Sequence, residues 1–377
     1  MLSHQRQALR VALFRLPVVL LLLFFLVACS ENDRPLESPV TLQGDIFGTY
    51  YQVTVADALT QGQAKELEKG FVAELDAIDA SMSTWKEDSE LSRFNRVPVG
   101  EWQTLSAPLM EVMDISQRVS DASHGAFDVT VGKLVNLWSF GPEARPKKVP
   151  SNALIAERLD AVGMQHLELD NSELKARRLK DIQVDLSGVA KGYATDRVAA
   201  YLSEQGYEHY LVNLGGEIKV RGYRDAESEH WRIGVEVPVN GQPTAEQILP
   251  LENISVATSG DYRNYFEQNG QRYSHTIDPR DGQPIHHRMA SVTIVHDANA
   301  EADAWATAMS VLGEREGLEA AIRENIAVLM LVREDGHWQS LVSPAFAEYF
   351  GEALINDMNA RIVGQVKQDL PPNDPAE

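Results

Sequence analysis

The sequence predicts an α+β fold made of mostly antiparallel sheets with flanking helices. Short segments rich in β-branched and aromatic residues follow one another across turns, and helical segments interrupt them irregularly. The pair Asn269-Gly270 between two such segments is a strong signal for a hairpin of antiparallel strands. A doubly wound sheet would need regular alternation of strands and helices, and the sequence contains no GxGxxG or Walker-type loop.

In the first half of the chain, hydrophobic spacing predicts one strand and three helices. The segment Ile46 to Ala56 alternates between apolar and polar residues, as a half-buried strand does. Large apolar residues recur every three or four positions from Gln63 to Met82, which is typical of an amphipathic helix. Ala107 to Ser123 and Ser151 to Val162 are also expected to be helical.

The second half of the chain is predicted to consist of many short strands and three further helices. Apolar segments bounded by turn residues predict the strands. The expected strands are His166 to Asp170, Leu174 to Arg178, Asp181 to Leu186, His209 to Leu214, Glu217 to Gly222, Trp231 to Val237, Ile254 to Ser259, Tyr262 to Gln268, Gln271 to Thr276, Met289 to Val295 and Ala327 to Val332. The expected helices are Val189 to Glu204, Ala300 to Gly313 and Glu314 to Asn325.

The composition is that of a globular protein with a substantial core. The chain has 377 residues, of which 44% are hydrophobic and 24% are charged. The formal net charge is -21, and no Lys/Arg cluster is dense enough to bind a phosphate backbone. We therefore exclude nucleic-acid binding. A ligand that bears phosphate would need a metal ion or backbone donors to offset this acidic background.

The N-terminus has the features of a targeting segment. Basic residues precede an apolar run, Leu16 to Ala28, whose length suits a secretory signal peptide. The run ends in Leu26-Val27-Ala28-Cys29, which resembles a bacterial lipoprotein cleavage box, so Cys29 would become the lipidated first residue. The alternative is a simple signal peptide with an incidental cysteine. Cys29 is the only cysteine, which excludes a disulfide within the chain and a multi-thiolate metal site.

These features divide the chain into four parts. We expect a lipoprotein signal peptide over residues 1–28, a flexible tether over 29–42, one folded domain over 43–350 and a polar, disordered tail over 351–377. The expected location is the bacterial cell envelope, with a lipid anchor in the inner membrane and the domain facing the periplasm.

The stretch Val184 to Ala200 is a candidate anion site. It starts as an apolar strand, turns at Ser187-Gly188 and continues as a helix. Free backbone N–H groups and the helix dipole at such a helix start favour a negatively charged ligand. Asp185 and Lys191 place charges of opposite sign on either side of the turn. An ordinary strand-to-helix connection is the alternative.

A second candidate pairs Asp303 with Thr307. Their spacing of four places both side chains on one face of a helix. A carboxylate and a hydroxyl are hard oxygen ligands that Mg²⁺ accepts, together with backbone carbonyls, water and substrate phosphates. A capping aspartate and a threonine bonded back to its own helix would give the same pattern.

The third candidate is His275, which lies on the expected second strand of the hairpin and would point opposite to its neighbours. Next to a phosphate site, this histidine could take a proton from an attacking hydroxyl. A histidine with a structural role is the alternative. The pair Gly215-Gly216 would let the backbone approach a ligand closely, and Trp85, Phe94 and Phe127 could stack on a flat ring.

Six segments, in this order, resemble the FAD:protein FMN transferase family, the ApbE-like lipoproteins. They are STWKEDSELSRFN, GAFDVTVGKLVNLW, DLSGVAKGYATDRVA, YLVNLGGEI, SGDYRNYFEQNGQRYSHTIDPRDGQP and ADAWATAMSVLG. The resemblance extends from about Ile46 to Leu341 and implies an ApbE-like fold with a flavin transferase domain over 43–350.

The resemblance also implies the chemistry. Similar proteins bind FAD and Mg²⁺ and transfer FMN to a threonine or serine hydroxyl of an exported or membrane protein, such as a subunit of a membrane redox complex, with release of AMP. Some relatives hydrolyse FAD to FMN and AMP instead, so a Mg²⁺-dependent FAD pyrophosphatase is one alternative. A non-catalytic lipoprotein that binds flavin is another.

Carried over to this sequence, the resemblance assigns the site residues. His275 would be the base, and Asp303, Thr307 and the backbone carbonyl of Gly188 would be the metal ligands. The expected FAD contacts are Met82, Trp85, Ala126, Phe127, Asp128, Asp185, Lys191 and Ile277. Two positions depart from the family pattern. Ala306 replaces an acidic residue found before the threonine in some members, and Trp85 stands where tyrosine is common.

Overall fold

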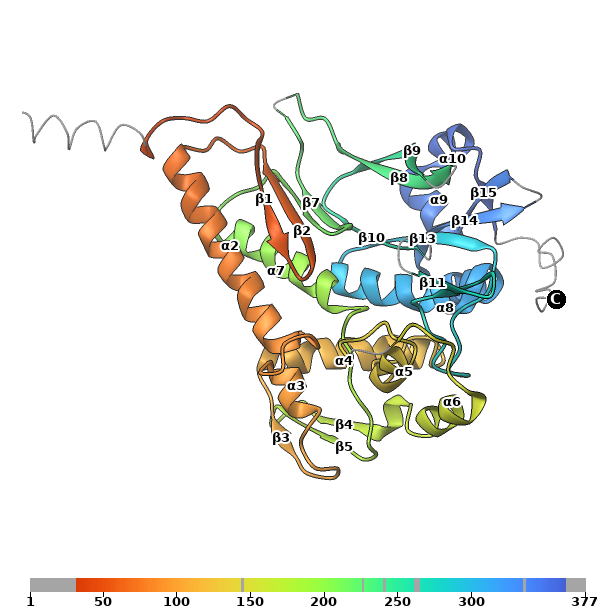
Figure 1. Cartoon of the computed structure of the whole chain (residues 1–377). Coiled ribbons are helices and arrows are strands. Elements are labelled where there is room, and N and C mark those ends of the chain that lie inside the picture. Colours follow the sequence, from red (N-terminus) through yellow and green to blue (C-terminus); the bar gives the residue numbers. More distant parts are fainter. Residues whose placement is uncertain are drawn as a thin grey trace, which may run out of the picture.

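The structure is a computed structural model of the whole chain (Figure 1). It describes residues 32–143, 146–225, 227–239, 242–260, 265–334 and 337–363. The expected signal peptide and Cys29 therefore lie outside the described residues, as does part of the segment 259–265. Within the described ranges, no helix is long and apolar enough to cross a membrane.

A nine-stranded sheet forms the centre of the fold. Its strands are β1 (Val40–Ile46), β2 (Thr49–Val55), β6 (Tyr210–Leu214), β7 (Glu217–Arg221), β10 (Ser255–Gly260), β13 (Met289–His296), β14 (Ala327–Glu334), β15 (His337–Val342) and β16 (Arg361–Ile362). They lie side by side in that order. Every neighbouring pair is antiparallel except β15 and β16, which are parallel.

Three smaller sheets surround the central one. They consist of β3 (Gln103–Thr104), β5 (Lys175–Arg178) and β4 (Leu167–Asp170); of β8 (Trp231–Val239) and β9 (Gln242–Leu251); and of β11 (Tyr265–Gln268) and β12 (Gln271–Ser274). Each small sheet is also antiparallel. The mainly antiparallel pairing confirms the predicted α+β class.

The helices flank the sheets. They are α2 (Gln61–Met82), α3 (Glu90–Phe94), α4 (Ala107–Ala122), α5 (Gly132–Leu137), α6 (Asn152–Leu159), α7 (Ala190–Glu204), α8 (Asn299–Arg323), α9 (Pro344–Phe350) and α10 (Glu352–Asp357), with a short 3₁₀ turn at Met164–His166. The capping box between Thr60 and Gln63 starts α2, and its apolar stripe faces the core as the spacing predicted.

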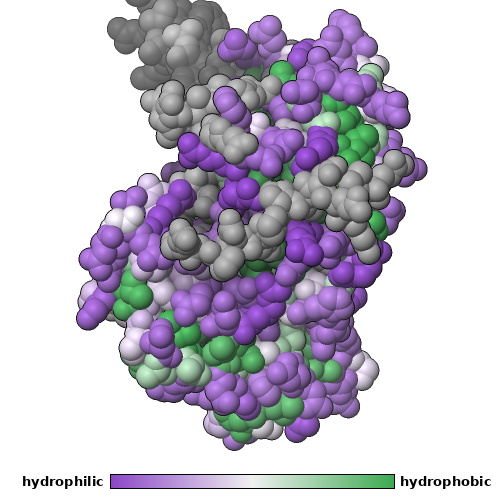
Figure 2. Space-filling view, turned by 90° about the vertical axis from the view of Figure 1, so that its right-hand side faces the viewer, coloured by the Kyte–Doolittle hydropathy of each residue, from purple (hydrophilic) through white to green (hydrophobic). Residues whose placement is uncertain are grey.

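The central sheet has an apolar core on each face. Along β14, Val328 and Met330 pack into the larger core with α7 and α8, whereas Leu329 and Leu331 pack into a second core with α9. A strand buried on both faces is continuously apolar, as this segment is. Outside the cores, the face shown in Figure 2 is largely hydrophilic, with its apolar side chains in separate groups.

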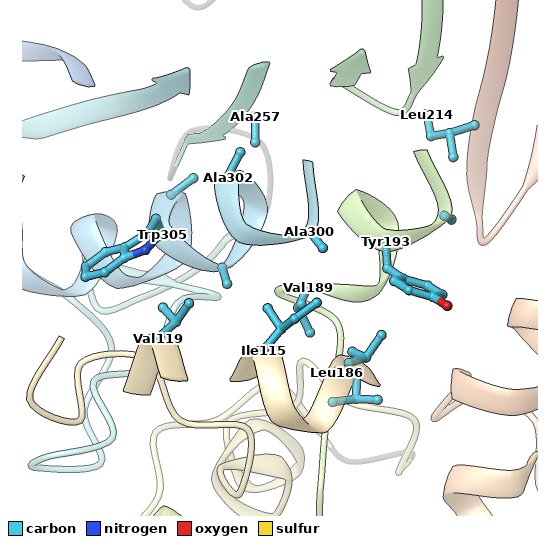
Figure 3. Packing of buried hydrophobic residues seen from close by; sticks show 14 of the residues in the cluster. Ile115, Val119, Leu186, Val189, Tyr193, Leu214, Ala257, Ala300, Ala302 and Trp305 are labelled. Carbon is cyan, nitrogen blue, oxygen red and sulfur yellow. The ribbon is translucent and has the colours of Figure 1, made fainter. Parts of the chain in front are cut away.

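The larger core joins α8 to the turn between residue 185 and α7. Ile115 and Val119 of α4 lie below Val189 and Trp305, and these side chains come close together (Figure 3). The α8 segment contains a break at Gly313, whose φ of 73° and ψ of -176° are not helical. The two helices expected on either side of this glycine are therefore present, and the turns before it face the site described below.

The structure corrects several expected boundaries. The expected tether, 29–42, includes folded residues, because the Leu36 N–H donates to the Leu59 carbonyl (2.8 Å) and Val40–Leu42 belong to β1. The expected tail, 351–377, is folded at its start: it contains α10 and β16, while 364–377 lie outside the described residues. Apolar residues such as Ile355, which packs into the second core, explain why the start of this segment is folded.

Strand assignments also differ in places. Asp181 to Leu186 is not a strand and makes only a single bridge, between Gln183 and Val131. The strands β9 and β15 were not predicted. Polar and proline residues interrupt the apolar pattern of β9, and the first half of β15, His337-Trp338-Gln339, is polar and aromatic rather than continuously apolar.

Candidate functional site

A cavity of about 610 Å³ lies where α7, α8, β7, β10 and the loop after β12 meet. Most of the site residues expected from the sequence line it, although they are far apart in the chain. They are Ala126, Phe127, Asp128, Asp185, Gly188, Lys191, His275, Ile277, Asp303 and Thr307. Five of the six sequence segments, all except STWKEDSELSRFN, therefore contribute residues to one cavity, whose size suits a small-molecule ligand.

The turn before α7 is fixed by hydrogen bonds on both sides. The side-chain amide of Asn95 donates to the Val184 carbonyl, and its oxygen accepts from the Val184 N–H, both at 2.8 Å. Asp185 donates its N–H to the Val129 carbonyl (2.7 Å), and its carboxylate accepts from the Ser187 N–H (2.9 Å). The start of α7 is thereby held against the cavity in one orientation.

Gly188 and Thr307 are in close contact across the cavity wall. A Cβ atom on Gly188 would lie 3.0 Å from Thr307 Oγ1 and 3.2 Å from Phe127 Cε2. A side chain larger than glycine would therefore crowd both neighbours. The turn and the first half of α8 approach each other closely because this position has no side chain.

Asp303 lies one helical turn before Thr307 and is buried, with 3% of its surface exposed. Its Oδ2 accepts a hydrogen bond from the Gly192 N–H (3.0 Å). Its Oδ1 lies 3.8 Å from Lys191 Nζ, and Lys191 forms a short ion pair with Glu217. The Lys191 ammonium group therefore lies between the buried carboxylates of Glu217 and Asp303, which line the cavity.

The pKa values in this cluster reflect the balance of burial and charge. Burial and the nearby Asp303 raise the pKa of Glu217 to about 7, against the opposing effect of Lys191. Burial also raises the pKa of Asp303, which Lys191 partly offsets. Burial lowers the pKa of Lys191, but Asp303 and Glu217 outweigh this effect and the net shift is upward. The ammonium group stays charged as long as its two partners are ionised.

The donor set at this point fits an oxygen-ligated cation. Asp303 and Thr307 face the cavity from successive turns of α8, and Gly188 adjoins Thr307. The described residues contain no group of three His, Cys, Asp or Glu side chains suited to a metal. A site made of one carboxylate, one hydroxyl and one carbonyl is of a different kind and matches the preferences of Mg²⁺. Ala306 is buried, with 1% exposed, and adds no oxygen.

His275 lies in the loop that follows β12, so the expectation that it sits within a strand is wrong. The strand ends at Ser274, whose hydroxyl accepts from the Thr276 N–H (3.2 Å) and starts a turn. The turn, rather than strand alternation, brings His275 and Ile277 to the cavity. The ring of Phe140 meets that of His275 edge-on, with 6.3 Å between the ring centroids.

A column of aromatic rings supports this loop. Trp138, which is fully buried, stacks on Tyr273 (centroids 5.7 Å apart), and Tyr273 stacks on Phe266 (5.1 Å). The Trp138 indole N–H donates to the Gly282 carbonyl (2.9 Å). The hairpin β11–β12 and the loop that bears His275 are thus fixed to α5 and its surroundings.

Asp128 lines the cavity, and hydrogen bonds from Thr130 hold its carboxylate in place. Its Oδ1 accepts from the N–H (2.7 Å) and the hydroxyl (2.6 Å) of Thr130. Burial raises the pKa of Asp128, and the bonds from Thr130 and from the Met164 backbone oppose that shift. The adjacent Phe127 and Ala126 are buried at the cavity wall.

Two expected FAD contacts do not line the cavity. Met82 is buried in the larger core at the end of α2, and Trp85 is 69% exposed. The structure therefore does not bring them to the site, and their contact with FAD stays a prediction.

Sequence reasoning missed two charged residues of the cavity. Glu217 follows the pair Gly215-Gly216, for which only a backbone role was expected, and Arg232 lies on β8. In the described part of the chain, no acid or hydrogen-bond acceptor pairs with the Arg232 side chain. A charged residue beside a glycine pair could have indicated Glu217, whereas the sequence has no local signal for Arg232.

Comparison with solved structures shows that this fold resembles that of flavin transferases. The structure resembles the flavin transferase ApbE from Vibrio cholerae with a TM-score of 0.75 and 39% identity, covering 83% of this chain and 99% of that one. It resembles the flavinyl transferase ApbE from Pseudomonas stutzeri with a TM-score of 0.77 and 36% identity, covering 83% and 97%.

Sequence comparison identifies the family. The chain belongs to the ApbE family, whose sequence model matches residues 47–330. The FAD:protein FMN transferase of Vibrio cholerae is 39% identical over 335 residues, which are 89% of this chain and 98% of the relative. That of Haemophilus influenzae is 40% identical over 328 residues, or 85% and 93% of the two chains.

Proposed function

We propose that this protein is an FAD:protein FMN transferase. The observation that carries the proposal is the cavity in which Asp303, Thr307, Gly188 and His275 meet, since it brings oxygen atoms of the kind that Mg²⁺ accepts together with a histidine that could accept a proton. Membership of the ApbE family supports the same conclusion, because relatives that align with most of the chain are named for this activity.

In the proposed reaction, an acceptor hydroxyl attacks the FAD phosphorus that carries riboflavin. A phosphoester bond forms between that phosphorus and the acceptor oxygen, the pyrophosphate bond breaks, and AMP leaves with the bridging oxygen. The acceptor is a threonine or serine of an exported or membrane protein, such as a subunit of a membrane redox complex. No oxidant or reductant is needed, because the flavin is transferred intact.

His275 would take the proton from the acceptor hydroxyl as the new bond forms. The loop after β12 presents this side chain at the cavity, and the stacked rings of Trp138 and Tyr273 hold the hairpin in place. A fixed base lowers the barrier by accepting the proton without reorganisation. The placement agrees with the role implied by the sequence resemblance.

Asp303, Thr307 and the carbonyl of Gly188 would hold Mg²⁺. When bound, Mg²⁺ neutralises charge on the pyrophosphate oxygens and on the leaving AMP. The close approach of Gly188 to Thr307 supports this assignment, because it keeps the Gly188 backbone beside the threonine hydroxyl. Asp303 would contribute the only carboxylate of the set.

The phosphates of FAD would be bound by the start of α7 and by Arg232. Helix starts attract anions through their dipole. At the start of α7 the N–H groups of Ala190 and Gly192 are already bonded, to the Leu186 carbonyl and to Asp303, so the dipole rather than these donors would act on the phosphates. Lys191 is already paired with Glu217, whereas the Arg232 side chain has no partner among the described residues. Arg232 is therefore available to offset the negative charge of Asp128, Asp185 and the ligand.

The proposed location is the periplasmic side of the cell envelope, with a lipid on Cys29. The basic N-terminus, the apolar run and the cysteine after Leu26-Val27-Ala28 support it. Membrane fractionation of cells that express the wild-type chain or Cys29→Ser tests it. Loss of membrane association in the variant is expected, and retention in the membrane fraction would contradict the anchor.

The function is tested by coupling AMP release to an acceptor. The purified protein is incubated with FAD and Mg²⁺, with and without an exported candidate acceptor from the same genome, and AMP is measured by chromatography. Acceptor-dependent AMP, equal in amount to the flavin bound covalently, is expected. Equal AMP and FMN without an acceptor would point to the pyrophosphatase, and intact FAD would point to a binding protein.

A further inference from the structure

Lys191 is held unequally between two carboxylates. Its ammonium forms a short ion pair with Glu217 Oε1 but lies 3.8 Å from Asp303 Oδ1, beyond hydrogen-bond distance. Glu217, which starts β7, is 3% exposed, so the sheet fixes its position. Its other oxygen, Oε2, is buried and accepts no hydrogen bond from the described residues. The ammonium group is thus drawn toward the glutamate.

An ammonium group in direct contact with Asp303 would oppose cation binding. Two positive charges on one carboxylate repel each other strongly in a buried site, where the effective dielectric constant is low. The Gly192 N–H already occupies Asp303 Oδ2 (3.0 Å), so Oδ1 is the oxygen for which a cation and Lys191 would compete.

We propose that Glu217 is a positioning residue that holds Lys191 away from Asp303 and so keeps Asp303 Oδ1 open to a divalent cation. The proposal rests on the proposed metal site. Glu217 touches neither the cation nor the reacting atoms. It acts by providing Lys191 with a nearer partner than Asp303.

The inference predicts opposite effects for two substitutions. In Glu217→Gln, the lysine loses its nearer ionic partner and moves to Asp303, so divalent-cation affinity falls about tenfold or more, as expected for loss of a buried ionic partner. In Lys191→Met the competitor is absent, and affinity equals or exceeds that of the wild type. The double variant Glu217→Gln/Lys191→Met regains wild-type affinity. A glutamate that only supported the fold would give no such rescue.

Binding of Mn²⁺ to the full chain without FAD, followed by electron paramagnetic resonance of the free ion, tests this inference without measuring activity. Mg²⁺ competition checks that the same site is measured, and circular dichroism checks folding. Asp303→Asn is the reference variant. Loss of Mn²⁺ binding in Asp303→Asn and in Glu217→Gln, with rescue in the double variant, would support the proposal.

Other outcomes overturn it in distinguishable ways. If Asp303→Asn loses binding but Glu217→Gln binds as the wild type does, the role of Glu217 is wrong while the metal site stands. If Asp303→Asn binds as the wild type does, the metal site itself is wrong and the inference falls with it. If Glu217→Gln does not fold, Lys191→Met still tests the proposal. Weaker Mn²⁺ binding in Lys191→Met than in the wild type would contradict competition by the lysine.

Discussion

Gly188 and Thr307 lie so close that the smallest possible side chain on the glycine would press on the threonine hydroxyl. The two residues are more than a hundred positions apart, and a Cβ atom added to Gly188 would lie 3.0 Å from Thr307 Oγ1. Gly188 is not among the glycines with positive φ, so its backbone conformation does not require glycine. The requirement comes from the space beside Thr307.

Gly188→Ala should therefore damage the site more than the fold. Alanine adopts the same backbone conformation without strain, but its methyl group displaces Thr307 Oγ1 by a few tenths of an ångström. We expect FMN transfer to fall by about tenfold or more and the Mg²⁺ requirement to rise. Transfer rates at a series of Mg²⁺ concentrations and a thermal melt check this. Wild-type Mg²⁺ dependence would show that the contact has no role in cation binding.

Thr307 should act through its hydroxyl. Thr307→Val keeps the shape of the side chain and removes the oxygen, so the Mg²⁺ concentration needed for half-maximal transfer should rise about tenfold or more. Thr307→Ser, the matched control, keeps the oxygen and should stay within about threefold of the wild type. Equal Mg²⁺ dependence in the two variants would rule out Thr307 as a ligand.

His275→Ala should separate binding from chemistry. Loss of a general base typically costs about 10²–10⁴ in rate, while FAD affinity should change little. Titration of FAD fluorescence measures binding, and single-turnover transfer measures the chemical step. A variant that no longer binds FAD would make His275 a binding residue rather than the base.

Arg232→Gln should weaken binding of the phosphate-bearing part of FAD. The substitution removes a cation that has no partner among the described residues, so FAD and ADP should bind about tenfold more weakly, whereas riboflavin binding should not change. Calorimetry with the three ligands measures this. Arg315→Gln, on the exposed surface of α8, is the control. Unchanged ADP affinity in Arg232→Gln would contradict a phosphate contact.

Trp138→Phe should loosen the loop that bears His275. The variant loses the bond from the indole N–H to the Gly282 carbonyl and leaves space in a fully buried position. We expect about 2–4 kcal/mol less unfolding free energy, from the lost hydrogen bond and the cavity together. Urea unfolding measures the loss, and transfer at 25 °C should be slower even when the variant is fully folded. An unchanged transfer rate would show that the aromatic column does not position His275.

The parts of the fold that were predictable are those with local signals. The apolar stripe of α2 and the Asn269-Gly270 turn gave the right elements, because helix periodicity and turn chemistry are set by neighbouring residues. Gly313 separates two helical segments, as expected. The strand β9 was missed because its polar and proline residues hide the alternation, and its pairing with β8 is a tertiary feature.

The candidate site was predictable mainly through its order of motifs. Each motif alone had an ordinary structural explanation, and only the six together indicated one site. The sequence could not show the contacts between motifs: Lys191 is paired with Glu217, and Gly188 lies against Thr307. Contacts between residues so far apart in the chain leave no local pattern in the sequence from which they could be predicted. Likewise, the position of Trp85 outside the cavity could not be foreseen from its place among polar residues.

Covalent attachment of FMN to an acceptor protein is the defining step of the proposed reaction, and intact-mass measurement detects it. Purified enzyme, FAD and Mg²⁺ are incubated with an exported acceptor and with a copy in which the acceptor threonine or serine is alanine, and masses are recorded after denaturation. We expect a mass increase equal to FMN minus water on the first acceptor alone. No mass increase on any acceptor of this kind, with FAD bound at the site, would contradict the proposed transfer.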